Sequence, residues 1–236
     1  MSKSELFEEN PLLSSPLRQT IGVLGGTGPE GRGIAVRFAS VGLSVVIGSR
    51  RKDKGRDAAA RLLSILPESD ILGTDNSDMI QRCDIVFLTV PFSAQQQMLQ
   101  AFAGALAGKV VVCTSVPIHF TNTGIELLLV HEGGSALQAK ADLPLASVVG
   151  AFQNIGAADL RKIDQPLNAD VIVASDCEGA KRKIMALCSL VPGLGAVDGG
   201  DLGSTPYVEA LTVLLLRINK NYPDKHATVK ITGIVS

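Results

Sequence analysis

The sequence predicts an α/β protein, a Rossmann-type doubly wound parallel sheet followed by a small C-terminal α/β lobe. Three observations predict it. A glycine-rich turn joins an apolar strand to a helical pattern near the start of the chain, and strands alternate with helices after it. Several of the strands are apolar without interruption, which is typical of strands covered on both faces.

The first unit reads as strand, turn, helix and strand. An apolar strand is expected at 21–24, the glycine turn at 25–31, a helix from about Pro29 to Gly42, and a second strand at 44–48. The free N–H groups and the positive dipole end of such a helix bind anions. This context favours a dinucleotide-binding βαβ unit over a glycine turn with a structural role alone.

Each glycine of the turn has an expected task. Gly26 allows the sharp exit from the strand, Gly28 leaves room for a pyrophosphate, and Gly31 lets the helix pack closely on the sheet.

The residues after the second strand indicate which dinucleotide binds. The carboxylate that usually holds an adenosine ribose is absent, and Ser49, Arg50 and Arg51 stand there, with Lys54 one turn later. A hydroxyl and cations pair with a 2′-phosphate that a carboxylate would repel. We therefore expect NADP, the alternative being a solvated basic loop at 50–56.

Further strands and helices alternate along the chain. Strands are expected at 71–72, 85–89 and 110–113, and helices at 53–66, at 78–82 and from about 93. Ligands of a doubly wound sheet lie beyond the carboxyl ends of its strands. Val90 and the residues around it, together with 116–118, are therefore expected to face the nicotinamide half of the cofactor.

The last third of the chain has a different pattern. Strands are expected at 147–152 and 171–174, helices at 178–190 and 207–222, and loops around Gly193, Gly195, Gly199 and Gly200. The expected division is a flexible N-terminal arm at 1–19, an NADP-binding domain at 20–146 and a small lobe at 147–236 that closes the substrate cleft. The apolar stripe of the helix at 207–222 suits core packing or a homodimer contact.

Composition excludes several classes of function. The chain has 236 residues and a formal net charge of −1, so nothing in bulk charge favours nucleic acid or an anionic membrane as a partner. No apolar run approaches the ~20 residues that span a bilayer, and the acidic N-terminus is unlike a signal peptide, so a cytoplasmic protein is expected. The four dispersed cysteines and three histidines have no metal-ligand spacing, so no metal is expected, and no side chain is assigned a catalytic role.

At this point the chain resembles a known family, the F420-dependent NADP oxidoreductases. The resemblance depends on Val23 to Gly28, Ile47 to Arg51, Leu88 to Phe92, Val116-Pro117, Val149 to Ala157 and Lys230 to Gly233. It runs from about residue 20 to the C-terminus and implies hydride transfer between NADPH and the deazaflavin coenzyme F420.

The resemblance also implies roles for individual positions. Thr27, Gly28, Pro29 and Glu30 would line the pyrophosphate. Ser49, Arg50 and Lys54 would hold the 2′-phosphate. Phe92, Gln96, Ile118 and Ala157 would surround the nicotinamide. The chain departs from the family where Gln153 replaces a frequent histidine and Gly156 replaces proline or serine, both near the second substrate.

Two other functions stay open at this level. The first is an NADPH-dependent reductase of another flavin-like ring or of an imine. An imine reductase would need a proton donor within reach of its substrate, and His119 and His131 are the histidines nearest the site loops in sequence. Hydride transfer between flat rings needs positioning more than acid catalysis. Gln153 and Asn154 either hydrogen-bond a ring edge or cap a turn. The second is a non-catalytic NADP-sensing module.

Overall fold

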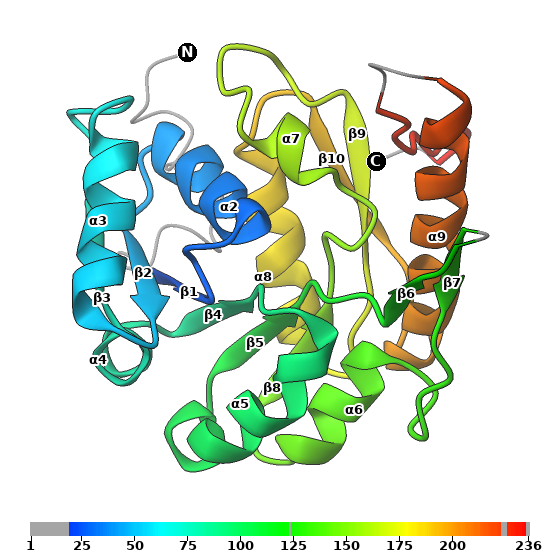
Figure 1. Ribbon diagram of the computed structural model, residues 1–236, viewed down its shortest axis with the longest axis horizontal. Helices are drawn as coiled ribbons and strands as arrows, with labels where there is room; N and C mark the ends of the chain where they lie inside the picture. The colour runs from blue at the N-terminus through cyan, green and yellow to red at the C-terminus, as the bar shows by residue number, and fades with distance from the viewer. Residues whose placement is uncertain (1–18, 123, 223–225, 235–236) are drawn as a thin grey trace.

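The computed structural model describes residues 19–122, 124–222 and 226–234. At its centre lies a six-stranded sheet of order β3-β2-β1-β4-β5-β8, with helices on both faces (Figure 1). Every pair of neighbours in this sheet is parallel, which confirms the predicted doubly wound fold. The strands are β1 (Ile21–Leu24), β2 (Val45–Ser49), β3 (Ile71–Asp75), β4 (Ile85–Leu88), β5 (Val110–Cys113) and β8 (Ser147–Gly150).

Each face of the sheet has its own hydrophobic core, because successive strand residues point to opposite faces. Phe87 packs on one face with Phe38 and Phe152, and its neighbour Leu88 packs on the other with Leu99. The first core takes side chains from α2 (Pro29–Ser40), α3 (Lys52–Leu63) and α8 (Glu178–Ser189), and the second from α4 (Asn76–Arg82), α5 (Phe92–Leu106) and α6 (Ser135–Asp142). Two covered faces explain the uninterrupted apolar strands.

One predicted strand has a different place in the fold. The strand expected at 147–152 belongs to the predicted C-terminal lobe, but the structure has it at Ser147–Gly150 as β8, which pairs with β5 in the register Val110↔Ser147 and is the last strand of the sheet. Adjacent parallel strands need a crossover connection. Helix α6 lies within that connection, and its eight residues are too short for a clear period. Where one domain ends and the next begins stays a prediction.

The rest of the C-terminal part contains a second small parallel sheet. Strands β9 (Ala169–Val173) and β10 (Leu194–Asp198) pair with α8 between them, and an isolated bridge joins Gly150 of β8 to Ala174. The expected loop position of Gly195 is wrong, since it lies inside β10. A Cβ there would lie 2.0 Å from Asp170 Oδ1, so this glycine permits close packing rather than a turn.

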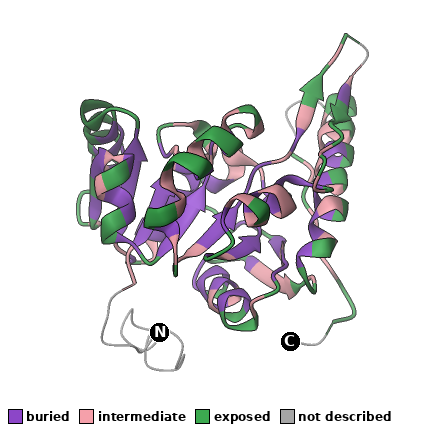
Figure 2. Ribbon diagram, turned by 90° about the horizontal axis from the view of Figure 1, so that it is seen from below, coloured by how far each residue is buried: buried purple, intermediate pink, exposed green. Residues whose placement is uncertain are grey.

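Five further short or late elements complete the described chain. They are the hairpin strands β6 (Ile118–Phe120) and β7 (Ile125–Leu127), α7 (Ala157–Leu160), the 3-10 turn η1 (Leu202–Ser204) and α9 (Thr205–Asn221). The hairpin projects beside α9, where Arg217 Nε donates to Ile125 O, and its side chains are largely exposed (Figure 2). Three-residue strands leave no periodic signal, so the sequence did not predict the hairpin.

Two further expectations concern the N-terminal arm and membrane-spanning helices. The N-terminal arm predicted at 1–19 lies outside the described residues except for Gln19. Among the helices that the structure describes, none has both the length and the apolar character needed to cross a bilayer.

Candidate functional site

A cavity of ≈ 1130 Å³ opens at the carboxyl ends of the sheet strands. It lies where the strand order changes direction between β1 and β4, the place at which doubly wound sheets bind their ligands. Its walls come from the β1–α2 turn, the residues that follow β2, β4 and β5, the segment 152–155 and helix α9.

The glycine turn forms the floor of the cavity. Gly25 has a φ of +83°, which favours glycine. A Cβ on Gly31 would lie 2.6 Å from Gly26 Cα, so this contact of α2 with the turn requires glycine at position 31. A Cβ on Gly26 would lie 2.9 Å from Ile47 Cγ2 and 3.0 Å from Val23 O. Gly26 and Gly31 lie beneath the surface and do not line the cavity. A Cβ on Gly28 would meet only Gly25 O at 3.5 Å, so the space above Gly28 is open to a ligand.

Helix α2 presents its N-terminus to this floor. Its N-cap is Gly28, which has no side chain to cap the first turn, so the N–H groups there are available to an anion. Thr27, Pro29 and Glu30 line the cavity around it. The predicted start of the helix at Pro29 is confirmed.

Glu30 differs chemically from its neighbours at this helix end. Its side chain is only partly exposed, and Oε1 is buried without a hydrogen-bond partner in the described part of the chain. Burial raises the pKa of this carboxyl to about 8. Glu30 is therefore a neutral acid at pH 7, which can donate a hydrogen bond to an anion instead of repelling it.

One end of the cavity is cationic. Its basic lining residues are Arg32, Arg50, Arg51, Lys54 and Arg61, beside the buried hydroxyl residue Ser49. Arg51 Nε donates to Asp53 Oδ1 at 3.1 Å, and Lys54 Nζ lies 3.7 Å from Asp57 Oδ2. Within the described ranges the guanidinium groups of Arg32, Arg50 and Arg61 have no such partner, so Arg50, the one of these that directly follows β2, is free to bind a ligand there.

The other end is formed by strand ends whose polar groups are already paired. Thr114 Oγ1 donates to Leu88 O at 3.0 Å, and Ser115 Oγ donates to Val90 O at 2.9 Å. Val90 and Ile118 add apolar surface to the same wall. This end therefore suits a flat, weakly polar ring.

The segment 152–155, which follows the end of β8, forms another wall of the cavity. Phe152 has a φ of +69°, a left-handed conformation that is uncommon outside glycine. Gln153 is only 5% exposed, and neither Oε1 nor Nε2 of its amide has a partner among the residues described. Thr212 Oγ1 in α9 donates to Gln153 O at 2.9 Å and holds the backbone of this turn.

The structure brings most of the predicted site residues to one cavity. Thr27, Gly28, Pro29, Glu30, Ser49, Arg50, Lys54, Val90 and Ile118 all line it. Phe92, Gln96 and Ala157 do not. On α5 the lining residues are Ala94, Gln97, Met98 and Ala101, a helical face that excludes Gln96. Ala157 lies on α7, which packs against α2 at Gly33.

Other lining residues were not predicted. Thr114 and Ser115 follow β5 as Val90 follows β4, and that equivalence was a usable signal. Asn76 begins α4 beside the end of β2, and Thr212 comes from α9. The sequence around Thr212 contains no motif, so only the tertiary fold brings it to the site. His119 follows Ile118 in β6 and is exposed outside the lining.

Comparison with known proteins agrees with this geometry. Residues 20–117 match the family described as NADP oxidoreductase, coenzyme F420-dependent. The F420-dependent NADP reductase of Methanocaldococcus jannaschii is 34% identical over 91% of this chain and 98% of its own length, and that of Methanothermobacter thermautotrophicus is 34% identical over 91% and 95%. A crystal structure from Arthrobacter sp. FB24, assigned to the same class of reductase, superposes with a TM-score of 0.76 at 23% identity, covering 91% of this chain and 99% of that one. The chain belongs to the family of F420-dependent NADP oxidoreductases.

Proposed function

We propose that this protein is an oxidoreductase that transfers a hydride between NADP(H) and the deazaflavin coenzyme F420. The observation that carries the proposal is the continuity of one cavity from the cationic cluster, across the N-terminus of α2, to the weakly polar end below Gln153. Such a cavity fits a phosphorylated dinucleotide with a second flat ring beside its nicotinamide. The relatives named above carry this activity in their names.

The residues present fit NADP. The open space at Gly28 and the uncapped start of α2 suit the pyrophosphate. Ser49, Arg50 and Lys54 suit the 2′-phosphate, with Arg50 contributing most because Arg51 already pairs with Asp53. NADPH would supply a hydride at the far end of the cavity, where the walls include Val90 and Ile118.

The protein's own contribution to such a reaction is positioning. Hydroxyl groups that are already hydrogen-bonded and apolar side chains would contact the face of the nicotinamide ring. No charged side chain is needed on this wall, so the wall need not hold water beside the ring. The unpartnered amide of Gln153 would gain hydrogen bonds if it turned toward the polar edge of the second ring. We propose Gln153 as the residue that distinguishes one ring acceptor from another.

The decisive experiment mixes the purified protein with NADPH and one acceptor at a time: F420, FMN or a cyclic imine. We expect turnover with F420, seen as loss of deazaflavin absorbance. Turnover with FMN or the imine alone would contradict the proposal and favour another reductase. Tight NADPH binding without oxidation by any acceptor would favour a sensing module.

The cofactor assignment has a separate test by calorimetry. Arg50→Ala should weaken NADPH binding about tenfold or more and leave NADH binding nearly unchanged, because charge-assisted bonds to a phosphate are lost. Arg56→Ala is the matched control, since Arg56 is exposed on α3, the helix that follows Arg50, but does not line the cavity. Equal losses for both nucleotides would contradict the assignment.

We also propose a homodimer and a cytoplasmic location. Exposed apolar side chains gather on the hairpin and α9, where Phe120 is 70% exposed and Leu214 is 53% exposed, which supports a self-association surface. The four cysteines are free thiols, which is usual in a reducing compartment. Size-exclusion chromatography with light scattering tests the first proposal, and Phe120→Asp should yield monomers.

A further inference from the structure

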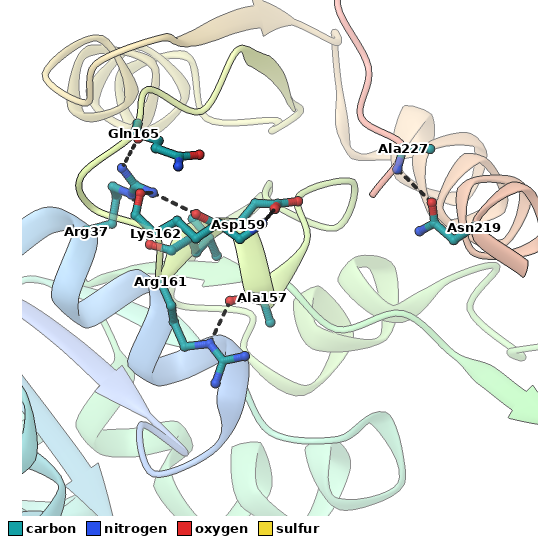
Figure 3. Close-up of polar contacts among 9 residues, drawn as sticks. Arg37, Ala157, Asp159, Arg161, Lys162, Gln165, Asn219 and Ala227 are labelled. Atoms are coloured by element: carbon teal, nitrogen blue, oxygen red, sulfur yellow. Dashed lines mark hydrogen bonds and ion pairs between the residues drawn. The ribbon is translucent and has the colours of Figure 1, made fainter. Parts of the chain in front are cut away.

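Helix α2 does more than present its N-terminus to the cavity. Two turns further on, Arg37 is only 2% exposed, and its guanidinium donates four hydrogen bonds to backbone carbonyls of a distant segment. In Figure 3 the side chain reaches from α2 to the backbone of Asp159, Lys162 and Gln165. Because Arg37 is buried and its four acceptors all lie between residues 159 and 165, its side chain fastens this segment to α2.

The four bonds are short and use every nitrogen of the guanidinium. Nε donates to Leu160 O at 3.0 Å and Nη1 to Gln165 O at 2.9 Å. Nη2 donates both to Asp159 O at 2.7 Å and to Lys162 O at 2.8 Å. Only a planar fork with several donors can satisfy carbonyls in these directions, so lysine is no substitute for arginine here.

The fastened segment, residues 156–165, continues directly from the wall of the cavity. Phe152, Gln153 and Ile155 line the cavity, and Gly156 starts the turn into α7. Phe38, the neighbour of Arg37 on α2, also contacts Phe152, with ring centroids 6.0 Å apart. Helix α2 therefore meets the floor of the cavity at its N-terminus and contacts the Phe152–Ile155 wall and the segment after it two turns later.

Gly33 allows α2 and the segment 156–165 to pack closely. A Cβ on Gly33 would lie 2.7 Å from Leu160 Cβ and 3.3 Å from Ala157 O. The absence of a side chain at Gly33 lets the segment approach α2 closely enough for Arg37 to reach its carbonyls.

We propose that Arg37 is a positioning residue, which fixes the separation between the phosphate-binding end of α2 and the Phe152–Ile155 wall. This role rests on the proposed function: by fixing the wall, Arg37 would place the second ring against the nicotinamide. Hydride transfer depends steeply on the distance between donor and acceptor atoms, so a small displacement of this wall should slow the reaction without removing any contact to NADP.

The test compares Arg37→Lys with the wild type in NADPH:F420 assays. We expect kcat to fall about tenfold to a hundredfold, since misplacement of about 1 Å can cost a hundredfold. The KM for F420 should rise, the Kd for NADPH should change less than about twofold, and the isotope effect with NADPH deuterated at the transferred position should increase. A merely structural role would lower Tm and leave kcat and the isotope effect of the folded protein unchanged, and that result would overturn the proposal.

Two further variants and one independent readout separate the outcomes. Gly33→Ala keeps Arg37 but pushes the segment away, so it should shift the isotope effect in the same direction. Arg161→Lys is the control, because Arg161 is exposed at the end of α7 and, among the residues described, its side chain bonds only to Ala157 O. Amide hydrogen exchange over 152–165 needs no substrate, and faster exchange in Arg37→Lys is required by the proposal. An inactive wild type would refute the proposed function, whereas an active wild type with unchanged Arg37→Lys kinetics or exchange would refute this inference alone.

Discussion

Protonation of Glu30 should control how NADPH affinity depends on pH. The carboxyl lies at the start of α2, with Oε1 buried and unpaired among the described residues, and burial raises its pKa to about 8. A neutral acid there is compatible with the pyrophosphate, whereas a carboxylate beside it repels the same anion. NADPH affinity should therefore be full at pH 7 and fall as Glu30 loses its proton.

The magnitude follows from the linkage between proton and ligand. If only the protonated form binds well, the Kd for NADPH is multiplied by about 1 + 10^(pH − 8), which is about 1.1 at pH 7 and about 11 at pH 9. Between these pH values the affinity should drop roughly tenfold, which corresponds to about 1.4 kcal/mol of binding free energy. Glu30→Gln keeps the shape of the side chain and cannot ionise.

Calorimetric titration with NADPH at pH 7, 8 and 9 measures this effect, because the 2′-phosphate, whose second pKa is about 6, changes its charge only slightly across that range. The wild type should lose about tenfold in affinity, and Glu30→Gln should stay flat. A wild type that binds equally at pH 7 and 9 would refute the reasoning. An equal loss in Glu30→Gln would assign the effect to another group.

Three further outcomes are expected. Gly31→Ala should lower the free energy of unfolding by roughly 2 kcal/mol or more, because its Cβ would overlap Gly26 Cα, whereas Gly28→Ala should leave urea unfolding nearly unchanged and weaken NADPH binding. Glu209→Ala should lower the free energy of unfolding in urea at pH 8 by about 1–3 kcal/mol, because the Glu209 carboxylate accepts hydrogen bonds from Ser135 N and Ala136 N at the buried start of α6. A loss under about 0.5 kcal/mol would contradict this. Burial raises the pKa of Glu209 from 4.5 to about 7. The protonated side chain therefore stabilises the fold below pH 4.5, and this contribution is lost as the pH rises through 7. Glu209→Gln should flatten this part of the curve of stability against pH, and an unchanged slope would count against the prediction.

The sequence predicted the parts of the fold whose signals are local. The glycine turn, the start of α2 and β5 at 110–113 agree with the structure residue by residue or nearly so, because strand propensity, turn chemistry and helix periodicity all act there within a few residues. The hairpin β6–β7 and α6 were missed because each is too short to have a period.

The residues of the candidate site likewise divide into those with a local sequence signal and those without one. Residues of the turn and the strand ends, such as Thr27, Arg50 and Val90, could be located because topology dictates where strand ends lie. Gln96 does not line the cavity whereas its neighbour Gln97 does, because each step along a helix rotates the side chain by about 100°. Thr212 and Arg37 act through contacts with residues 59 or more positions away, and no local pattern encodes such contacts.

The place of β8 in the sheet also governs how the chain can be divided. A fragment that stopped at residue 146 would uncover the whole hydrogen-bonding edge of β5, and exposed edges of this kind recruit other strands. It would also lack Phe152, which fills the core against Phe38 and Phe87. The nucleotide-binding half is therefore expected to aggregate when excised, so the two halves must be expressed together.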